Sequence, residues 1–483
     1  MSRAAGVLAT VALAAALMAI RPAGAGPAPG RFPSANVTFL GHGNGPGYGM
    51  GQWGAFGYAA VKHWTYQQIL GHYYSDAAHP VTMSKLSTPA DARILKVVIE
   101  ENDGQAVAVT SPSPFVFEDQ TGKTIASLAA GQAARAVDSA TTGTWSVQTG
   151  SACSKSTKWT TVASGVKDPV AVPRSLSSTA PASQLLTLCE GNGNHVTYRG
   201  KLEAFDYYGA ATNYQHYSRT INEVSLEQYV GDVTPSESPA GWATYGGTTK
   251  APQHEPWGFQ ELEAQAVAVR TYVLYSISVG GWYGYADICD DVCQSYFAGV
   301  ANETATSRAA AHDTEGEYLL QSGGPAPTEY EASSGGYTET LSYYNGVTIF
   351  TGVPDAGDSV CIGGRGTLGC NPEHDWTASV PVSTIQSAYP SIGTLVSVKV
   401  TAKDASGRVS EIELQGSKGT ETVTGVTFIE QFGGFLSTLF QVTDGPGATA
   451  KATSMSPGRA PRGRPGDERP VGLPAAAPAA TGG

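Results

Sequence analysis

The stretch Trp257-Gly-Phe-Gln-Glu-Leu-Glu-Ala-Gln-Ala-Val-Ala-Val-Arg-Thr-Tyr-Val-Leu-Tyr-Ser-Ile277 carries the strongest helical pattern in the chain. Its apolar side chains recur every three or four residues and share one face, at Leu262, Ala266, Val269, Val273 and Leu274. Acidic residues near its start suit the positive end of a helix dipole. The pattern predicts one long helix over residues 257–277.

Outward from this helix, a shorter helix is expected on its N-terminal side. The sequence Ser225-Leu-Glu-Gln228 has the form of a capping box, in which serine and glutamine satisfy backbone groups at a helix start. We expect Pro235 to end that helix, because proline removes a helical hydrogen bond. Residues 63–74 and 303–312 are also expected to be helical.

Short runs rich in branched and aromatic residues predict strands before these helices. Residues 95–99, 106–109 and 115–117 are such runs, and turn residues separate them. We therefore expect a β-rich domain over residues 84–220. Further strand-like segments lie near 318–320, 328–332 and 397–401. The predicted fold class is α+β, a β-rich domain combined with a helix-containing domain.

Composition excludes several functions. The chain has 483 residues, a formal net charge of −12 and only 14% charged residues, against roughly 25% in an average domain. A pI near 5.2 argues against a protein that grips nucleic acid by its phosphates, and against a basic membrane-surface protein. A hydrophobic content of 41% is enough for a full core, so global disorder is excluded.

The N-terminus has the pattern of a secretory signal peptide. Arg3 precedes an apolar run over residues 4–20, and Ala23-Gly-Ala25 supplies the small residues of a cleavage site. We expect cleavage after Ala25, with an uncleaved membrane anchor as the alternative. No other stretch reaches about 18 apolar residues, so no transmembrane segment is expected in the mature protein, which should be secreted or cell-wall-associated.

Composition also suggests how the chain is divided. Residues 444–483 are rich in Pro, Ala and Gly, which predicts a disordered tail. The expected divisions are a signal peptide (1–25), a Gly-rich N-terminal element (36–80), the β-rich domain (84–220), a catalytic core (221–443) and the tail (444–483).

Six cysteines in an exported chain predict disulfides. Six cysteines permit fifteen pairings, and spacing does not select one of them. We favour the pairing of neighbours, Cys153 with Cys189, Cys289 with Cys293 and Cys361 with Cys370. For Cys289 and Cys293 the alternative is zinc, but no histidine lies at a characteristic spacing, and we expect no metal and no cofactor.

A first candidate for chemistry is the Gly-rich block of residues 41–60. It lacks the Gly-Lys-Ser/Thr of a phosphate-binding loop and does not follow a strand as a dinucleotide fingerprint would. Its glycines permit close approach of the backbone to a ligand. His42, Gln52 and Trp53 carry groups suited to a sugar surface, although a merely flexible loop is the alternative.

A second candidate is Glu237 in Thr234-Pro-Ser-Glu-Ser-Pro239. Flanking prolines stiffen the segment, and an apolar setting would raise the pKa of the carboxyl as a general acid requires. A third candidate is the segment 287–296, which contains Gln294 and Tyr296. The fourth is Ser333-Ser-Gly-Gly336, which lacks a nucleophile elbow and is expected to be a ligand-contacting turn.

Together these motifs resemble the SpoIID/LytB family, which comprises stage II sporulation protein D and the amidase enhancer LytB. The resemblance covers residues 36–443 and rests on the four segments 228–239, 264–272, 287–296 and 333–338. The Gly-rich block resembles the family's Gly-His-Gly…Gly-Met-Ser-Gln-Trp-Gly-Ala element, which lies here at the N-terminus. Each motif alone is a weak signal, but the four motifs together, in this order, make the resemblance specific.

The chain departs from the family pattern near the candidate glutamate and in the Gly-rich block. Ser238 stands where the family usually has Met, and Gly51 replaces a serine. Pro46 and Tyr48 stand where a second histidine often occurs, and residues 240–257 are an insertion.

The resemblance implies a lytic transglycosylase that cleaves peptidoglycan glycan strands, with Glu237 as its single acid/base. In that reaction the glutamic acid protonates the glycosidic oxygen. The carboxylate then takes a proton from the muramic acid 6-hydroxyl, which closes a 1,6-anhydro ring. The residues expected to bind substrate are Arg270, Gln294, Tyr296, Ser334, Gly335, Gly336, His42, Gln52 and Trp53.

Three alternatives stay open at this point. Arg270 has a structural reading, an ion pair with an acid such as Asp287. The whole protein could be a non-catalytic wall-binding protein that stimulates a peptidoglycan amidase, as LytB does, and the departures favour this reading. A purely structural β-rich adhesin would leave the motifs without a role.

Overall fold

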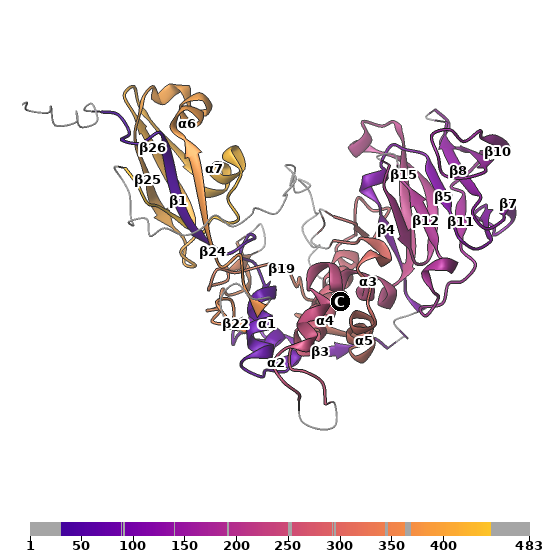
Figure 1. Cartoon of the computed structure of the whole chain (residues 1–483), viewed down its shortest axis with the longest axis horizontal. Coiled ribbons are helices and arrows are strands. Elements are labelled where there is room, and N and C mark those ends of the chain that lie inside the picture. Colours follow the sequence, from indigo (N-terminus) through magenta and orange to yellow (C-terminus); the bar gives the residue numbers. More distant parts are fainter. Residues whose placement is uncertain are drawn as a thin grey trace, which may run out of the picture.

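The computed structural model describes residues 30–445, except residues 88, 90–91, 140, 191–192, 250–253, 292, 294–295, 343–345 and 363–368. The predicted signal peptide and nearly all of the predicted tail lie outside the described residues. Figure 1 shows three parts: a β-sandwich, a helical part beside it, and a C-terminal β module at the other end. The helical part lies between the two β parts and carries the candidate site.

The β-sandwich is formed by strands between Ile94 and Ser225, together with a short strand at Ile288–Cys289. Its two sheets have strand orders β10-β9-β8-β5-β12-β13 and β16-β4-β15-β14-β11-β6-β7, and they share one apolar core. All neighbours are antiparallel except the short β16, which pairs with β4 in parallel. The strands are β4 (Ile94–Val98), β5 (Val107–Thr110), β6 (Phe115–Glu118), β7 (Thr124–Leu128), β8 (Ala133–Asp138), β9 (Trp145–Gly150), β10 (Thr160–Val166), β11 (Val170–Val172), β12 (Leu186–Cys189), β13 (His195–Tyr198), β14 (Lys201–Tyr208), β15 (His216–Ser225) and β16 (Ile288–Cys289).

The helical part is built around α4, where the sequence pattern predicts the long helix. Every residue from Phe259 to Thr271 is buried, so the helix is covered on all sides rather than on one face. Its many alanines permit this, because small side chains let neighbouring elements approach closely. The helices are α1 (Gln52–Ala60), α2 (Tyr66–Tyr74), α3 (Leu226–Glu237), α4 (Phe259–Ser278) and α5 (Ala305–Asp313), and each of the others packs against α4 or α3.

Short strands connect this part to the Gly-rich block. Strand β17 pairs with β3 and β18, and β19 pairs in parallel with β2 at the start of α1. The strands are β2 (Met50–Gly51), β3 (Thr82–Lys85), β17 (Glu317–Gln321), β18 (Gly324–Pro325), β19 (Tyr330–Glu331), β20 (Leu341–Ser342), β21 (Thr348–Phe350), β22 (Cys361–Ile362) and β23 (Gly369–Cys370).

The C-terminal β module includes the first strand of the described chain. Strand β1 lies between β24 and β28, and a second sheet, β25-β26-β27, completes a separate apolar core with α6 and α7. The elements are β1 (Asn36–His42), β24 (Asp375–Pro381), α6 (Val382–Ala388), β25 (Leu395–Lys403), β26 (Val409–Gly416), β27 (Thr420–Thr424), α7 (Gly425–Phe432) and β28 (Phe440–Val442). The range 221–443, which we expected to form one core, therefore spans two packing units. We did not foresee this because the sequence alone does not show that β1 belongs with β24.

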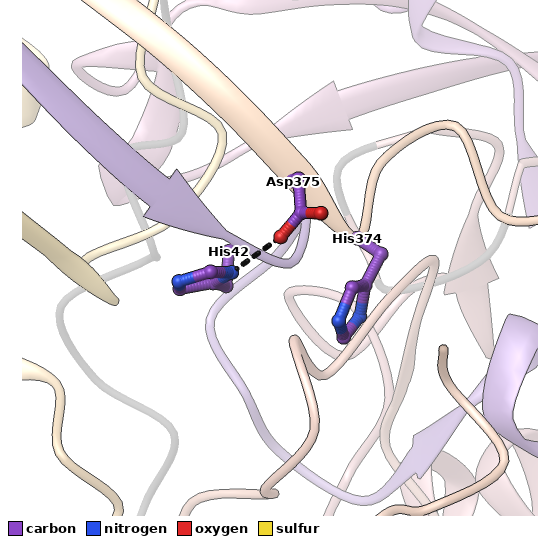
Figure 2. Close-up of side chains that lie close together, drawn as sticks. All are labelled: His42, His374 and Asp375. Carbon is purple, nitrogen blue, oxygen red and sulfur yellow. Dashed lines mark hydrogen bonds and ion pairs between the residues drawn. The ribbon is translucent and has the colours of Figure 1, made fainter. Parts of the chain in front are cut away.

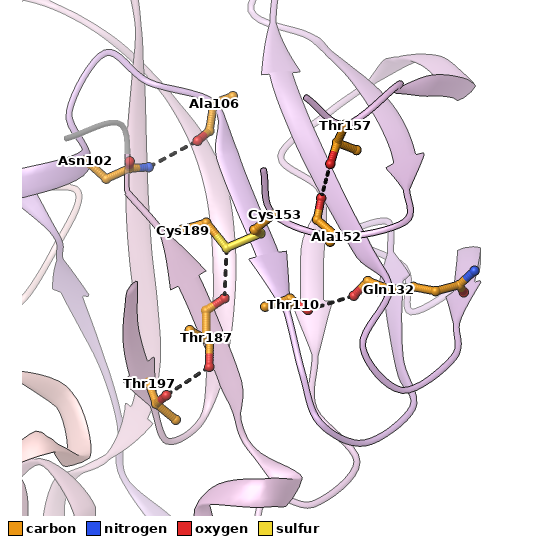
Figure 3. The surroundings of a disulfide bond; sticks show 10 residues. All are labelled: Asn102, Ala106, Thr110, Gln132, Ala152, Cys153, Thr157, Thr187, Cys189 and Thr197. Carbon is orange, nitrogen blue, oxygen red and sulfur yellow. Dashed lines mark hydrogen bonds between the residues drawn. A yellow bond between two sulfur atoms is a disulfide. The ribbon is translucent and has the colours of Figure 1, made fainter. Parts of the chain in front are cut away.

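Three disulfides join the cysteines in chain order, as we predicted: Cys153–Cys189, Cys289–Cys293 and Cys361–Cys370. The first ties the loop after β9 to the end of β12 in the sandwich (Figure 3). The second closes a short loop just before Tyr296. In the described part of the chain, no helix is both long and apolar enough to cross a membrane.

Candidate functional site

The candidate acid/base Glu237 is the last residue of α3 rather than part of a loop. The helix begins at the predicted capping box, where Ser225 Oγ accepts a hydrogen bond from Gln228 N and Gln228 Oε1 accepts one from Ser225 N. Pro235 lies inside the last turn, and the helix continues two residues beyond it. Our expectation that Pro235 ends the helix is therefore wrong, because Ser238 N still donates to Thr234 O.

Two segments distant in sequence hold the carboxyl group of Glu237. Gln52 Nε2, at the start of α1, donates to Glu237 Oε2 at 3.0 Å. The backbone N–H of Tyr296 donates to Glu237 Oε1 at 2.7 Å. The Gly-rich block, the end of α3 and the segment after the Cys289–Cys293 disulfide therefore meet at this carboxyl.

Burial raises the pKa of Glu237 to about 7, because desolvation disfavours the ionised carboxylate. The two hydrogen bonds from Tyr296 and Gln52 oppose this shift, and the charge of Asp291 adds to it slightly. Part of the Glu237 side chain remains accessible to solvent although its carboxyl is densely surrounded by protein. Near neutral pH the group is populated in both protonation states, as an acid/base requires.

The position of Gln52 follows from how the Gly-rich block packs. Strand β2 pairs with β19, and Trp53 N donates to Ala332 O at 3.1 Å, which fixes the start of α1. Gly49 has a φ of +72°, and a Cβ there would lie 1.8 Å from Glu329 O. The glycines of this block thus let its backbone lie directly against residues 329–335, whereas we had expected them to approach a saccharide.

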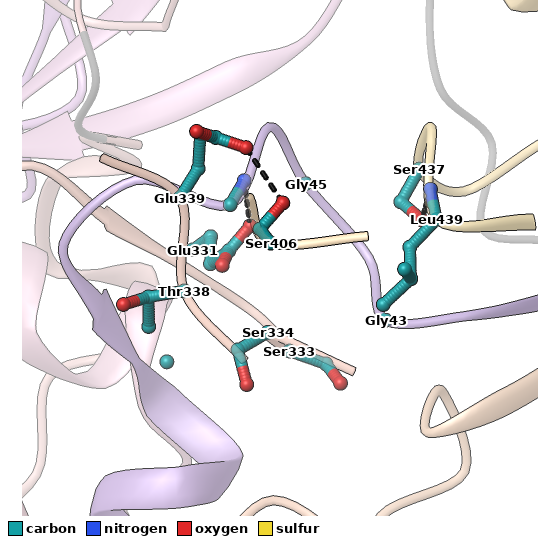
Figure 4. Close-up of polar contacts among 12 residues, drawn as sticks. Gly43, Gly45, Glu331, Ser333, Ser334, Thr338, Glu339, Ser406, Ser437 and Leu439 are labelled. Atoms are coloured by element: carbon teal, nitrogen blue, oxygen red, sulfur yellow. Dashed lines mark hydrogen bonds between the residues drawn. The ribbon is translucent and has the colours of Figure 1, made fainter. Parts of the chain in front are cut away.

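The side chains and backbone of the Ser-Gly-Gly turn are held by contacts within the protein. Ser334 is fully buried, and its hydroxyl donates to Asp355 Oδ2 at 2.8 Å and accepts from Gly336 N at 3.1 Å. A Cβ on Gly43 would collide with the backbone of Gly335. Figure 4 shows the Gly-rich block passing beside this turn. The expectation that Ser334, Gly335 and Gly336 contact a ligand is not supported for the Ser334 side chain, because Asp355 already holds it.

Arg408, which sequence analysis did not single out, holds the block and the turn together. It is 2% exposed, although it comes from the C-terminal β module. Its Nη2 donates to Ser334 O at 3.1 Å and lies 3.9 Å from the buried carboxyl group of Glu331, while Nη1 donates to Gly45 O at 3.5 Å. A lone arginine before a strand gives no sequence signal for this role.

Aromatic side chains lie next to Gln52. Trp53 is half-buried and its ring centroid lies 4.7 Å from that of Trp242, which stacks on Phe56 at 4.6 Å. Tyr296 is 51% exposed. Rings of this kind suit the apolar faces of sugars. Trp242 lies in the insertion 240–257, so the insertion contributes to this cluster.

Arg270 does not lie at Glu237, which corrects the expectation that it binds substrate. It is fully buried, and its Nε and Nη2 form a two-pronged ion pair with Glu227, at the opposite end of α3 from Glu237. Ten residues of helix separate Glu227 from Glu237, a rise of about 15 Å. The structural reading of Arg270 is therefore right in kind, with Glu227 rather than Asp287 as the partner.

His42 also lies apart from the contacts of Glu237. It ends β1, and its Nδ1 is 2.8 Å from Asp375 Oδ1. Asp375 is the first residue of β24, so this contact belongs to the C-terminal β module. Gln294 lies outside the described residues. Of the predicted site residues, Gln52 and Tyr296 are the two for which a hydrogen bond to Glu237 is described.

Comparison with protein families finds one matching region in the chain. Residues 214–320 match the model of the family described as SpoIID, Stage II sporulation protein. The matched region contains α3, α4 and Tyr296, and the match supports a sporulation- and cell-wall-related class of protein. Three disulfides are compatible with a place outside the cytoplasm.

Among curated proteins, the chain is 22% identical over 223 residues to an uncharacterized protein of Brachyspira hyodysenteriae (strain ATCC 49526 / WA1). The similarity covers 45% of this chain and spans about half, 54%, of that relative's length.

Proposed function

We propose that the protein is an exported lytic transglycosylase that cleaves peptidoglycan glycan strands with Glu237 as the single acid/base. The observation that carries the proposal is the environment of the Glu237 carboxyl. It is desolvated, its pKa is raised to about 7, and it accepts hydrogen bonds from Gln52 and Tyr296. The family match over 214–320 supports peptidoglycan as the substrate class.

This environment suits both steps of the reaction. Protonated Glu237 would deliver its proton to the glycosidic oxygen as the bond to the muramic acid C1 breaks. The carboxylate so formed would be stabilised by the same two donors, which are in place before the reaction starts. It would then accept the proton of the 6-hydroxyl, whose oxygen closes the anhydro ring on C1. The acid is regenerated and no water is consumed.

The aromatic cluster is where we place the sugar. Trp53 directly follows the donor Gln52, Tyr296 itself supplies the second donor through its backbone N–H, and both residues are partly exposed. Stacking of a ring on a sugar face orients the strand without a charge. In this proposal Gln52 positions the acid, and Trp53 binds the glycan.

Analysis of the products that the protein forms from purified glycan strands tests the proposed reaction. Mass spectrometry after incubation should find 1,6-anhydro-muramyl ends, 18 Da lighter than the reducing ends that hydrolysis gives. Reducing ends would instead indicate a hydrolase, which needs a second carboxylate, and Asp291 would be the candidate because its charge acts on Glu237. Strands that remain intact would overturn the proposal.

The alternative is a non-catalytic protein that binds the wall and stimulates a peptidoglycan amidase. One observation favours it: Ser238 and Gly51, which depart from the family pattern, directly adjoin Glu237 and its donor Gln52. In that case the glycan strands stay uncut, and the protein accelerates release of stem peptides by an added amidase.

A further inference from the structure

A second group of ligating side chains lies in the C-terminal β module, away from the contacts of Glu237. His42 ends β1, Asp375 begins β24, and the two residues are directly opposite in the antiparallel ladder. His374 immediately precedes β24, so all three side chains lie at one end of this strand pair (Figure 2). Their potential ligand atoms all lie within 4.8 Å of one another.

We propose that His42, His374 and Asp375 form a binding site for a divalent transition metal of the zinc class. This inference is independent of the proposed glycan cleavage. Bonds of 2.0–2.2 Å place the ligand atoms of a tetrahedral zinc ion roughly 3.3–3.6 Å apart. His42 Nδ1 and Asp375 Oδ1 are already at 2.8 Å. The ligand atoms of the three side chains lie within 4.8 Å of one another, and rotation of the side chains would have to bring them to the tetrahedral spacing around one ion.

The surroundings of His374 are those of a metal ligand. Its Nδ1 lies 2.6 Å from Asp358 Oδ2, and Asp358 is fully buried. Ser333 Oγ donates to the same carboxylate at 2.8 Å, which fixes its orientation. A carboxylate on one ring nitrogen sets the tautomer, holds the ring in place and makes the other nitrogen, Nε2, a better ligand.

The donor set selects the class of ion. Two imidazoles and one carboxylate suit zinc and its neighbours, whereas magnesium and calcium prefer oxygen ligands throughout. The side chains of His42, His374 and Asp375 are 42%, 23% and 21% exposed. This exposure leaves room for water or another oxygen ligand as the fourth, so the site would be open rather than closed.

Metal content and titration calorimetry with ZnCl₂ test the site on the full secreted chain after chelation and buffer exchange. The parent should bind one zinc ion per chain. His374→Gln and His42→Gln should each abolish stoichiometric binding or weaken it by at least tenfold. His312→Gln is the matched control, because His312 is 81% exposed beside Asp313, and it should bind as the parent does.

Circular dichroism establishes that each variant is folded, and two separate histidine variants guard against the failure of one. Zinc should also raise the melting temperature of the parent but not of the two variants, because an ion that binds only the folded chain stabilises it. A parent that binds no zinc would overturn the proposal. So would folded His42→Gln and His374→Gln variants that bind zinc with parental affinity and stoichiometry, since the ion would then lie elsewhere.

Discussion

At the scale of single residues, the carboxyl of Glu237 is set by two donors that nothing in the local sequence around it reveals. Gln52 lies 185 positions earlier and Tyr296 lies 59 positions later. Burial raises the pKa of Glu237, while these two hydrogen bonds lower it, and the balance falls at about 7. The pH dependence of the reaction therefore depends on both donors.

Glycan cleavage should lose rate above pH 7. The first step needs protonated Glu237, so kcat/KM should fall about tenfold per pH unit once the carboxyl ionises, with an apparent pKa near 7. A pH–rate profile on soluble glycan strands measures it. An alkaline limb that begins near pH 4.5, as for a solvated glutamate, would contradict the assignment.

Replacement of Gln52 by Leu should move the alkaline limb of the pH–rate profile to higher pH. The Gln52 hydrogen bond lowers the pKa of Glu237, so its loss raises the pKa further, and the rate should also fall because the carboxylate loses a donor. Gln120→Leu is a matched control, since Gln120 donates to Glu203 in the β-sandwich. An unchanged limb in the Gln52→Leu variant would count against the role of Gln52.

Arg270 illustrates what sequence could not decide. A helix-borne arginine beside a candidate acid fits either a substrate ligand or an ion pair. The structure shows it fully buried against Glu227, and an unpaired Glu227 would be left in a largely buried place. Arg270→Met should therefore lower the free energy of unfolding by about 3–5 kcal/mol. Arg308→Met, at a half-exposed arginine, should cost no more than about 1 kcal/mol.

If the Arg270→Met variant has the same free energy of unfolding as the parent but a higher KM, the results would instead assign Arg270 to substrate binding. Chemical denaturation and steady-state kinetics distinguish the two results.

At the scale of elements, the Gly-rich block folds into the short strand β2 and the helix α1, and both are closely packed. Gly49 has a positive φ and no room for a Cβ against Glu329 O. Gly49→Ala should therefore destabilise the protein and detach Gln52 from Glu237. Gly71→Ala is an informative control, since it lies inside α2 with open space around it and should stabilise the helix by up to about 1 kcal/mol.

Melting temperature and cleavage rate report both effects. If Gly49→Ala melts and cleaves like the parent, the close packing of this block against residues 329–335 is not what positions Gln52.

Elements with strong local signals were predictable. The capping box at Ser225 does begin α3, and the periodic stretch at 257–277 forms α4 over Phe259–Ser278. The end of α3 was not predictable, because a proline in the last turn of a helix is tolerated when little helix remains after it. Strand β1 and helix α1 were missed because Gly41 in β1, and Gly54 and Gly57 in α1, weaken the strand and helix patterns.

At the scale of the whole molecule, contacts between distant segments account for what sequence did not predict. Strand β1 joins β24 and β28, more than 330 residues later, and this pairing brings His42 opposite Asp375. Arg408 comes from the same module and reaches the Ser-Gly-Gly turn. Local patterns do not report such contacts, so the membership of β1 in the C-terminal β module could not be predicted from the sequence.

Buried carboxyl groups should make the protein more stable in mild acid than at alkaline pH. Burial raises the pKa of Glu261, Glu263 and Glu331 to about 8, and that of Asp355 to about 7. The folded state thus holds protons that the unfolded chain loses above about pH 4.5. Stability from these groups is full below that pH and is lost as the pH rises to about 8.

Denaturant unfolding between pH 5 and pH 8 measures this effect. Each such carboxyl should lower the free energy of unfolding by up to about 1.4 kcal/mol per pH unit. Glu261→Gln should flatten the dependence, because the amide does not ionise, whereas the exposed Glu411→Gln should leave it unchanged. A stability that rises from pH 5 to pH 8 would contradict the burial of these groups.

The most direct measurement compares the products of the parent and of Glu237→Gln on purified glycan strands by mass spectrometry. The variant keeps the size of the side chain and removes its titrating proton, so formation of 1,6-anhydro-muramyl ends should fall by about 10²–10⁴-fold. Glu411→Gln, at an exposed glutamate of β26, should cleave like the parent. Anhydro ends formed by folded Glu237→Gln at the parental rate would contradict the assignment of Glu237 as the acid/base.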